Sequence, residues 1–157
     1  MNAVSKNKQS GFTIIEVVLV LAIAGLIFLM VFVALPTLQR NQRDTQRKQD
    51  LSRVMTAIAS YTQNNKGSIP TNWSKFNTDY LQAAGDSFVD PTFGPYTINT
   101  SLTDAPTGAT STIDKDGNIY VYPKKKCGEG ESLATGGERS VAFMMKLEGG
   151  GIACQSR

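Results

Sequence analysis

The sequence predicts an α+β protein in which a long N-terminal helix packs its second half on a small antiparallel β-sheet. An apolar run begins at Phe12 and continues to Leu35, which is longer than a soluble core helix needs. Apolar residues then recur with helical spacing between Leu51 and Tyr61. The last third of the chain holds short alternating segments separated by glycine and aspartate, which are typical of β-hairpins. A helix packed on a small sheet accounts for all three observations.

The composition of the 157 residues argues against an enzyme or a metalloprotein. The chain has no histidine, which excludes His-based triads, His general bases and His metal sites. Its two cysteines are too few for a zinc site of four cysteines. No nucleophile–base pair suggests itself either. We therefore expect no catalytic residue, no cofactor and no metal.

The net charge of +3 is unevenly distributed along the chain. Residues 1–11 carry Lys6 and Lys8 and no acid. Residues 39–53 carry more basic than acidic side chains. We interpret this second segment as a solvated helix face, and a patch that binds DNA or anionic lipid is the alternative.

The apolar run predicts a helix that crosses a membrane. No residue from Val17 to Leu35 is charged, and a helix from Phe12 would be roughly 36 Å long against about 30 Å for the hydrocarbon core of a bilayer. A cleaved secretory signal is the alternative, because Ala22 to Gly25 ("AIAG") has the small-x-small pattern. Glu16 inside the run, and the apolar stump that such cleavage would leave, argue against it.

The charges that flank the run do not settle its orientation, because both flanks are basic. Long domains cross membranes largely regardless of charge, and a pair of cysteines favours an oxidising exterior. We expect the leader in the cytoplasm and the C-terminal domain outside.

A short basic leader ending in glycine, then "GFTIIE" and a long apolar helix, resembles the type IV prepilins and the related pseudopilins. Gly11, Phe12 and the acid Glu16, followed by the apolar run, carry the resemblance, which covers residues 1 to about 65 well. It implies a pilin-like fold, cleavage between Gly11 and Phe12 by a membrane prepilin peptidase, and N-methylation of Phe12. It also implies that Glu16 matters for assembly of subunits into a filament.

Physical chemistry supports this role of Glu16. After cleavage, the ammonium group of Phe12 lies at a helix N-terminus, where the macrodipole adds partial positive charge. The Glu16 carboxylate of a neighbouring subunit can neutralise it in the low-dielectric core of a filament. Buried ion pairs often add little net stability, so we expect Glu16 to set axial register and incorporation more than affinity.

Gly25 and Pro36 are candidate points of helix flexibility. Pro36 lacks an N–H and clashes with the carbonyl of Phe32, so the helix should kink or loosen there. Gly25 also weakens the helix. The resemblance implies that a glycine-to-proline stretch melts when subunits pack, although the proline often falls a few residues earlier in that family. Ordinary tolerance of Gly and Pro in membrane helices is the alternative.

The helix is predicted to continue to about Asn64 and to stop at Gly67, with Pro70 beyond. Residues 37–52 are polar nearly all round and lack a stripe that faces a core. The stripe that should pack on the head comes later and consists of Leu51, Val54, Met55, Ile58 and Tyr61.

The head is predicted to contain a short amphipathic helix and two hairpins. Trp73, Phe76, Tyr80 and Leu81 indicate the helix, which Gly85 would close. After a turn-rich segment at 90–96 and an exposed loop at 101–112, Asp116-Gly117 predicts the turn of a first hairpin whose return strand is "NIYVY". A second hairpin joins "SVAFMMKL" to "IACQ" through "EGGG". Asp114, Asp116 and Asn118 resemble the start of a calcium loop, but its later ligands are missing.

Cys127 and Cys154 both lie near predicted strand ends. In a head outside the cell we favour a disulfide between them, worth roughly 3.5 kcal/mol in the chain-entropy model. Two free thiols, or pairing with a partner, are the alternatives. The resemblance also implies such a bond, because a disulfide-bounded C-terminal loop is a feature of many pilins. The residues between, "GEGESLATGGERS", are glycine-rich and predict a mobile loop.

These expectations define four regions: a leader at 1–11, a membrane or filament-core helix half at 12–36, an outer helix half at 37–65 and a head at 66–157. The leading hypothesis is a structural pilin subunit, first a single-pass protein of the cytoplasmic membrane and later part of a surface fibre for adhesion, twitching motility or DNA uptake. Its partners would be copies of itself, the prepilin peptidase, an assembly platform and a motor ATPase. The alternatives are a pseudopilin of a type II secretion or competence machine, and a membrane-tethered binding module that never polymerises.

Overall fold

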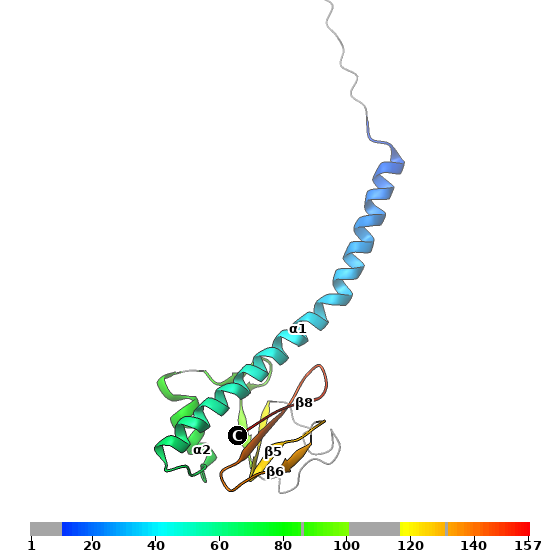
Figure 1. The fold of residues 1–157 in the computed structure, drawn as a ribbon. Helices are drawn as coiled ribbons and strands as arrows, with labels where there is room; N and C mark the ends of the chain where they lie inside the picture. The colour runs from blue at the N-terminus through cyan, green and yellow to red at the C-terminus, as the bar shows by residue number, and fades with distance from the viewer. Residues whose placement is uncertain (1–10, 86, 101–116, 131) are drawn as a thin grey trace, which may run out of the picture. The chain divides into compact units, whose positions relative to one another are not determined.

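The computed structural model describes residues 11–85, 87–100, 117–130 and 132–157. The chain divides into two compact units, one ending at Leu38 and the other spanning Gln39–Arg157. One helix, α1 (Ile14–Asn64), contributes to both units (Figure 1). Of the predicted leader at 1–11, only Gly11 is among the described residues. The loop expected at 101–112 lies outside them.

The part of α1 in the first unit buries no large apolar side chain. Exposed fractions of these side chains run from 48% at Val17 and Leu35 to 84% at Ile14. An apolar helix with no covered face is unstable in water, and it needs lipid or other apolar helices around it. The helix continues through Pro36 without a break.

The part of α1 in the second unit packs on the head. Leu51, Val54 and Ile58 are fully buried, as the helical stripe predicts. The helix ends at Asn64, and its end is closed by a bond from the Gly67 N–H to the carbonyl of Thr62 (2.7 Å). Gly67 has φ +84°, where a Cβ would be strained and would also press on the Arg139 guanidinium. The predicted end of the helix is therefore confirmed.

Short elements follow α1. The predicted amphipathic helix is present as α2 (Trp73–Phe76), a π-helical turn η1 (Asn77–Leu81) and a 3₁₀ turn η2 (Ala83–Gly85). The turn-rich segment forms a small antiparallel hairpin of β1 (Val89–Asp90) and β2 (Gly94–Pro95). Trp73, Phe76 and Leu81 are buried against α1 and the main sheet.

The main sheet has the order β3-β4-β7-β8, formed by β3 (Thr97–Asn99), β4 (Asn118–Pro123), β7 (Val141–Lys146) and β8 (Ile152–Ser156). The hairpin of β7 and β8 is confirmed. The predicted α+β fold with a small antiparallel sheet is confirmed by the pairs β4–β7 and β7–β8, and the sheet is mixed because β3 pairs with β4 in parallel. The "NIYVY" strand is present as β4, whose described neighbours are β3 and β7. The expected first strand of that hairpin lies outside the described residues.

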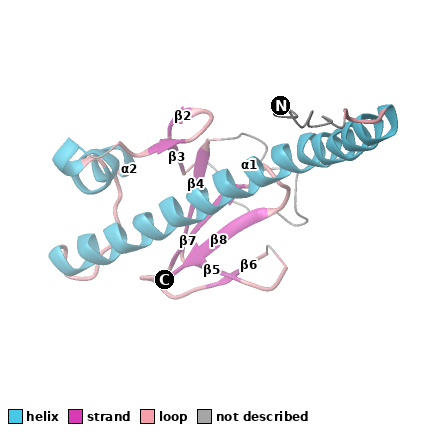
Figure 2. Cartoon of the chain, turned by 90° about the horizontal axis from the view of Figure 1, so that it is seen from above, coloured by secondary structure: helices cyan, strands magenta, loops and turns pink. Residues whose placement is uncertain are grey.

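A third layer was not predicted. Residues expected to form a mobile loop include β6 (Leu133–Thr135), which pairs with β5 (Lys125–Cys127) as a separate hairpin. This hairpin covers the face of the sheet that bears Tyr120, Tyr122 and Met144, while α1 covers the face that bears Val121 and Phe143. The arrangement explains why β4 and β7 are buried on both faces; Figure 2 shows α1 crossing the strands.

Candidate processing site and the ion-pair network of the head

The peptide bond between Gly11 and Phe12 lies before the first turn of α1. Gly11, Phe12 and Thr13 are exposed and not helical. Apart from its own chain neighbours, a Cβ added to Gly11 would meet no described atom within 4 Å. Helical hydrogen bonds therefore do not hold this peptide bond, and the segment can adopt the extended form in which peptidases bind their substrates.

Glu16 has a partner within its own chain. Its carboxylate Oε2 accepts hydrogen bonds from the backbone N–H of Thr13 (2.8 Å) and from the Thr13 hydroxyl (2.7 Å). The carboxylate thus satisfies an N–H at the start of the helix, as the glutamate of a capping box does. Thr13 was not among the predicted site residues, although the spacing T-x-x-E before an apolar run was the signal.

Gly25 and Pro36 both lie within α1. A Cβ added to Gly25 would meet nothing within 4 Å. Their roles in helix flexibility stay predictions.

The basic segment at 39–53 is only in part the solvated face that its polarity predicted, because Arg40, Lys48 and Arg53 are exposed but Arg47 is buried. Arg47 is 1% exposed, and its Nε donates to Asp90 Oδ2 at 2.6 Å while its Nη2 donates to Asp90 Oδ1 at 3.1 Å. This bidentate pair joins α1 to the β1–β2 hairpin. The Arg47 guanidinium also lies over the ring of Phe93, 5.6 Å from the ring centroid. The alternative, a patch for DNA or lipid, is not supported at Arg47 either, because the side chain is buried.

The same face of α1 holds the β7–β8 turn. The Asp44 carboxylate accepts from the backbone N–H groups of Glu148 and Gly149, each at 2.8 Å. Arg43 Nε donates to Glu148 Oε2 at 2.7 Å, and Asp44 also accepts from Arg47 at 3.2 Å. We call Asp44, Arg47, Asp90 and Glu148, together with Arg43, the α1 ion-pair network. It fixes two loops of the head on the helix.

Asp90, which belongs to this network, and Asp50, which lies beside it, have opposite pKa shifts. Burial raises the pKa of the Asp50 carboxyl, and a hydrogen bond from the Tyr96 hydroxyl (2.9 Å) only partly opposes this. Burial also raises the pKa of Asp90, but the hydrogen bonds from Arg47 and from two backbone N–H groups outweigh it, so the net pKa lies below the usual range. Burial and the Asp50 charge raise the pKa of Tyr96. Each acid is held by a partner, which is typical of a structural network.

The structure also bears on the candidate metal ligands and the cysteine pair of the sequence. No group of three or more Asp, Glu or Cys residues among the described residues could hold a metal ion. Of the candidate calcium ligands, Asp114 and Asp116 lie outside the described residues. Cys127 and Cys154 form a disulfide that links β5 to β8.

Comparison with known proteins gives one finding. Residues 6–32 match a family model described as the prokaryotic N-terminal methylation motif. No curated protein and no solved structure matches the chain. Among the described residues α1 is the one helix that is long and apolar enough to cross a membrane, a test that a signal sequence would also pass.

Proposed function

We propose that this chain, whose N-terminal methylation motif is that of type IV pilin-like and pseudopilin precursors, is a structural subunit of a type IV pilus filament. The observation that carries the proposal is the exposed apolar half of α1, most of which lies within the motif. In the precursor this half lies in a membrane, and in the filament it packs against the same half of other subunits.

Processing prepares the helix for this second environment. A membrane prepilin peptidase cuts between Gly11 and Phe12 and methylates the new amino group of Phe12. An assembly platform and a motor ATPase then extract the subunit from the membrane into the fibre. The head stays outside the membrane throughout, which suits its disulfide between Cys127 and Cys154.

Glu16 changes partner during assembly. In the single chain its carboxylate accepts from Thr13. After cleavage, the ammonium of Phe12 on a neighbouring subunit offers a full positive charge in a medium of low dielectric. This exchange favours one axial position of each subunit and so supplies register.

The mature N-terminus tests the processing step. Mass spectrometry of the membrane-extracted protein should find a chain that begins at N-methylated Phe12. An intact Met1, or a chain beginning at Gly25 or beyond, would overturn the proposal. Recovery of the chain in sheared surface fibres then tests the filament itself.

A pseudopilin is the second candidate, because the same motif is found in pseudopilin precursors. Such a subunit would form a short fibre inside a type II secretion or competence machine. Loss of secretion or of DNA uptake in a deletion strain, without loss of surface fibres, would identify it. A tethered module that never polymerises would instead be correctly processed and absent from every fibre fraction.

A further inference from the structure

We propose that the head carries a binding site for a neutral pyranose ring in a cavity at the C-terminal end of α1. The cavity has a volume of about 300 Å³ and lies between the end of α1 and the segment that contains α2 and η1. This size is at the small end of ligand sites, which suits one sugar ring better than a larger molecule. The inference does not depend on whether the chain polymerises.

Aromatic rings form part of the lining. The rings of Tyr61 and Tyr80 meet edge to face with centroids 5.2 Å apart, and both side chains are only partly buried. Phe76 lies behind them, stacked on Tyr80 at 5.6 Å. A sugar ring has an apolar C–H face, and a partly exposed aromatic surface in a cavity is what such a face packs on.

The polar groups that line the cavity are largely uncommitted. Lys75 Nζ and the Asp79 carboxylate make no hydrogen bond or ion pair with the described residues, and the same holds for both tyrosine hydroxyls. The Asn65 Nδ2 donates to the carbonyl of Tyr61 (2.8 Å), which leaves its Oδ1 free. The Asn72 Oδ1 accepts from the Lys75 N–H (2.9 Å), which leaves its Nδ2 free. Neighbouring donors and acceptors of this kind match the vicinal hydroxyls of a sugar, each of which both donates and accepts.

The charges favour a neutral ligand. Lys75 and Asp79 are the charged residues of the lining, and their charges cancel. The Lys75 ammonium would attract an anionic ligand, but the Asp79 carboxylate would repel it. A cationic ligand would be attracted by Asp79 and repelled by Lys75. A neutral hydroxyl pair can bond to both groups through charge-assisted hydrogen bonds.

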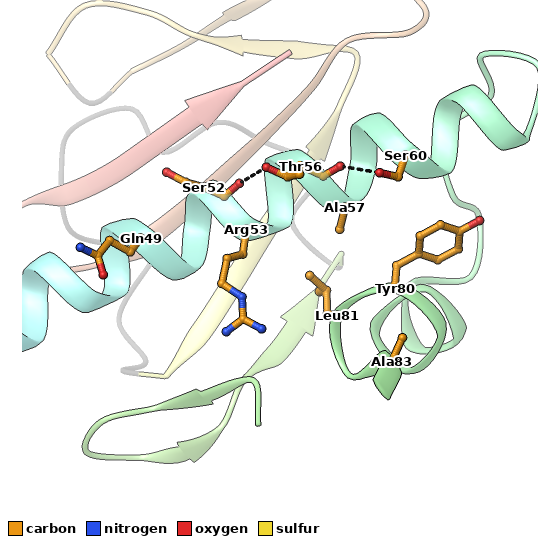
Figure 3. Close-up of a pocket in the computed structure, with 9 residues that line it drawn as sticks. All are labelled: Gln49, Ser52, Arg53, Thr56, Ala57, Ser60, Tyr80, Leu81 and Ala83. Atoms are coloured by element: carbon orange, nitrogen blue, oxygen red, sulfur yellow. Dashed lines mark hydrogen bonds between the residues drawn. The ribbon is translucent and has the colours of Figure 1, made fainter. Parts of the chain in front are cut away.

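A second cavity of about 420 Å³, also bordered by Tyr80, offers a contrast (Figure 3). Its hydroxyls are already committed, because Ser52, Thr56 and Ser60 each donate to the backbone carbonyl four residues earlier. Its cation, Arg53, lies 3.6 Å from Asp50 and 5.6 Å from the ring of Phe88. In Figure 3 the hydroxyl of Tyr80 points away from Arg53, so it is not directed into this cavity. We therefore place the sugar in the smaller cavity.

The test uses the full chain in a zwitterionic detergent without a sugar headgroup, titrated with methyl pyranosides of glucose, galactose, mannose and N-acetylglucosamine. Amide chemical shifts should change saturably for residues 72–80 with at least one of them, with a dissociation constant of about 1 mM. Lys75→Met and Asp79→Asn should each weaken binding about tenfold, because each removes a charge-assisted hydrogen bond. Both positions are exposed, so neither change should impair folding.

Lys126→Met and Glu129→Gln are the matched controls, because both residues are exposed and lie on or beside β5, away from the cavity. They should leave the affinity unchanged. The proposal fails if no pyranoside gives a saturable shift up to about 50 mM. It also fails if the shifts lie elsewhere in the head, or if the control variants weaken binding as much as the variants in the cavity.

Discussion

At the scale of single residues, Arg47 shows how a polar stretch of helix can belong to a core. Its side chain is 1% exposed, and the Asp90 side chain it contacts is fully buried. Removing both charges from water is costly, and only good geometry with further hydrogen bonds repays it. Asp90 meets this requirement, because its Oδ1 also accepts from the N–H groups of Thr92 (2.8 Å) and Phe93 (3.0 Å). The pair therefore specifies where the β1–β2 hairpin attaches to α1.

Replacing Arg47 by methionine should lower the free energy of unfolding by about 3–5 kcal/mol, because Asp90 would remain buried without its counter-charge. Chemical denaturation followed by the fluorescence of Trp73 measures this. Arg40→Met on an exposed face of the same helix is the control and should change stability by less than about 0.5 kcal/mol. The double variant Arg47→Met, Asp90→Asn should lose less than the sum of the single variants; strict additivity would show that the two side chains are not coupled.

Two buried tyrosines should respond in opposite directions to loss of their hydroxyls. The Tyr122 hydroxyl has no hydrogen-bond partner among the described residues, and burial raises its pKa. Tyr122→Phe should leave stability unchanged or raise it by up to about 1 kcal/mol. Tyr96→Phe should instead lower it by about 1–3 kcal/mol, because Asp50 loses its donor in a buried site. Equal losses in the two variants would contradict the assignment.

At the scale of elements, the sequence indicated α1 well because its signals are local. The end of the helix follows from Gly67, and the stripe from Leu51 to Ile58 follows from helical spacing. The same stripe continues backward through Asp50, Arg47 and Asp44, which are equally buried. Hydropathy cannot detect this continuation, because the partners that satisfy these charges lie far away in the sequence.

The sheet was harder to predict for a related reason. The strand β3 has three residues, and its parallel partner follows after a long connection, so no local turn signals the pairing. The strands of the β5–β6 hairpin have three residues each, which is too few for an alternating pattern to be recognised. Its buried contact includes Cys127, Leu133 and Cys154. The processing motif, by contrast, is contiguous, so its residues could be found from the sequence alone.

Reduction of the disulfide tests the third layer. Breaking the Cys127–Cys154 bond, whose partners are 27 residues apart, should lower the free energy of unfolding by roughly 3.5 kcal/mol. It should also expose the face of the sheet that bears Tyr120 and Met144, since the bond ties β5 over it. Hydrogen exchange at β4 and β7 before and after reduction measures this. A Cys127→Ala, Cys154→Ala variant should behave like the reduced protein; unchanged stability in both would show that the bond adds nothing.

The contact between α1 and the head should depend on pH with opposite signs at two acids. Asp90 has a lowered pKa in the folded state, so its contribution to stability is complete above the ordinary aspartate pKa of 3.8 and is lost as the pH falls through the folded value. Asp50 has a raised pKa, so its contribution is complete below 3.8 and is lost as the pH rises through its folded value. A carboxyl titration resolved by nuclear magnetic resonance should place the midpoints of the two residues on opposite sides of 3.8. Midpoints on the same side would contradict the burial and bonding described for one of them.

At the scale of the whole molecule, the head has a buried apolar core, whereas the apolar first half of α1 is left exposed. Among the described residues, both buried clusters lie in the unit from Gln39 to Arg157, and every large apolar side chain between Phe12 and Leu38 is exposed. In the proposed filament, burial of these exposed side chains between subunits would supply the free energy of assembly. Apolar contact alone allows many axial positions, because the surface is nearly uniform. A charge within it is what distinguishes one position from the others.

Glu16→Ala should therefore reduce incorporation into fibres far more than it reduces the amount of processed subunit in the membrane. Sheared fibres and membrane fractions compared by immunoblot measure the two quantities. Thr13→Ala is the matched control, because it removes the hydroxyl that Glu16 accepts from and keeps the carboxylate. If pairing with a neighbouring Phe12 ammonium is the role of Glu16, this control should assemble nearly normally, since loss of a cap costs only about 1 kcal/mol. Equal defects in the two variants would assign Glu16 to helix capping instead, and normal entry of Glu16→Ala into fibres would reject both roles.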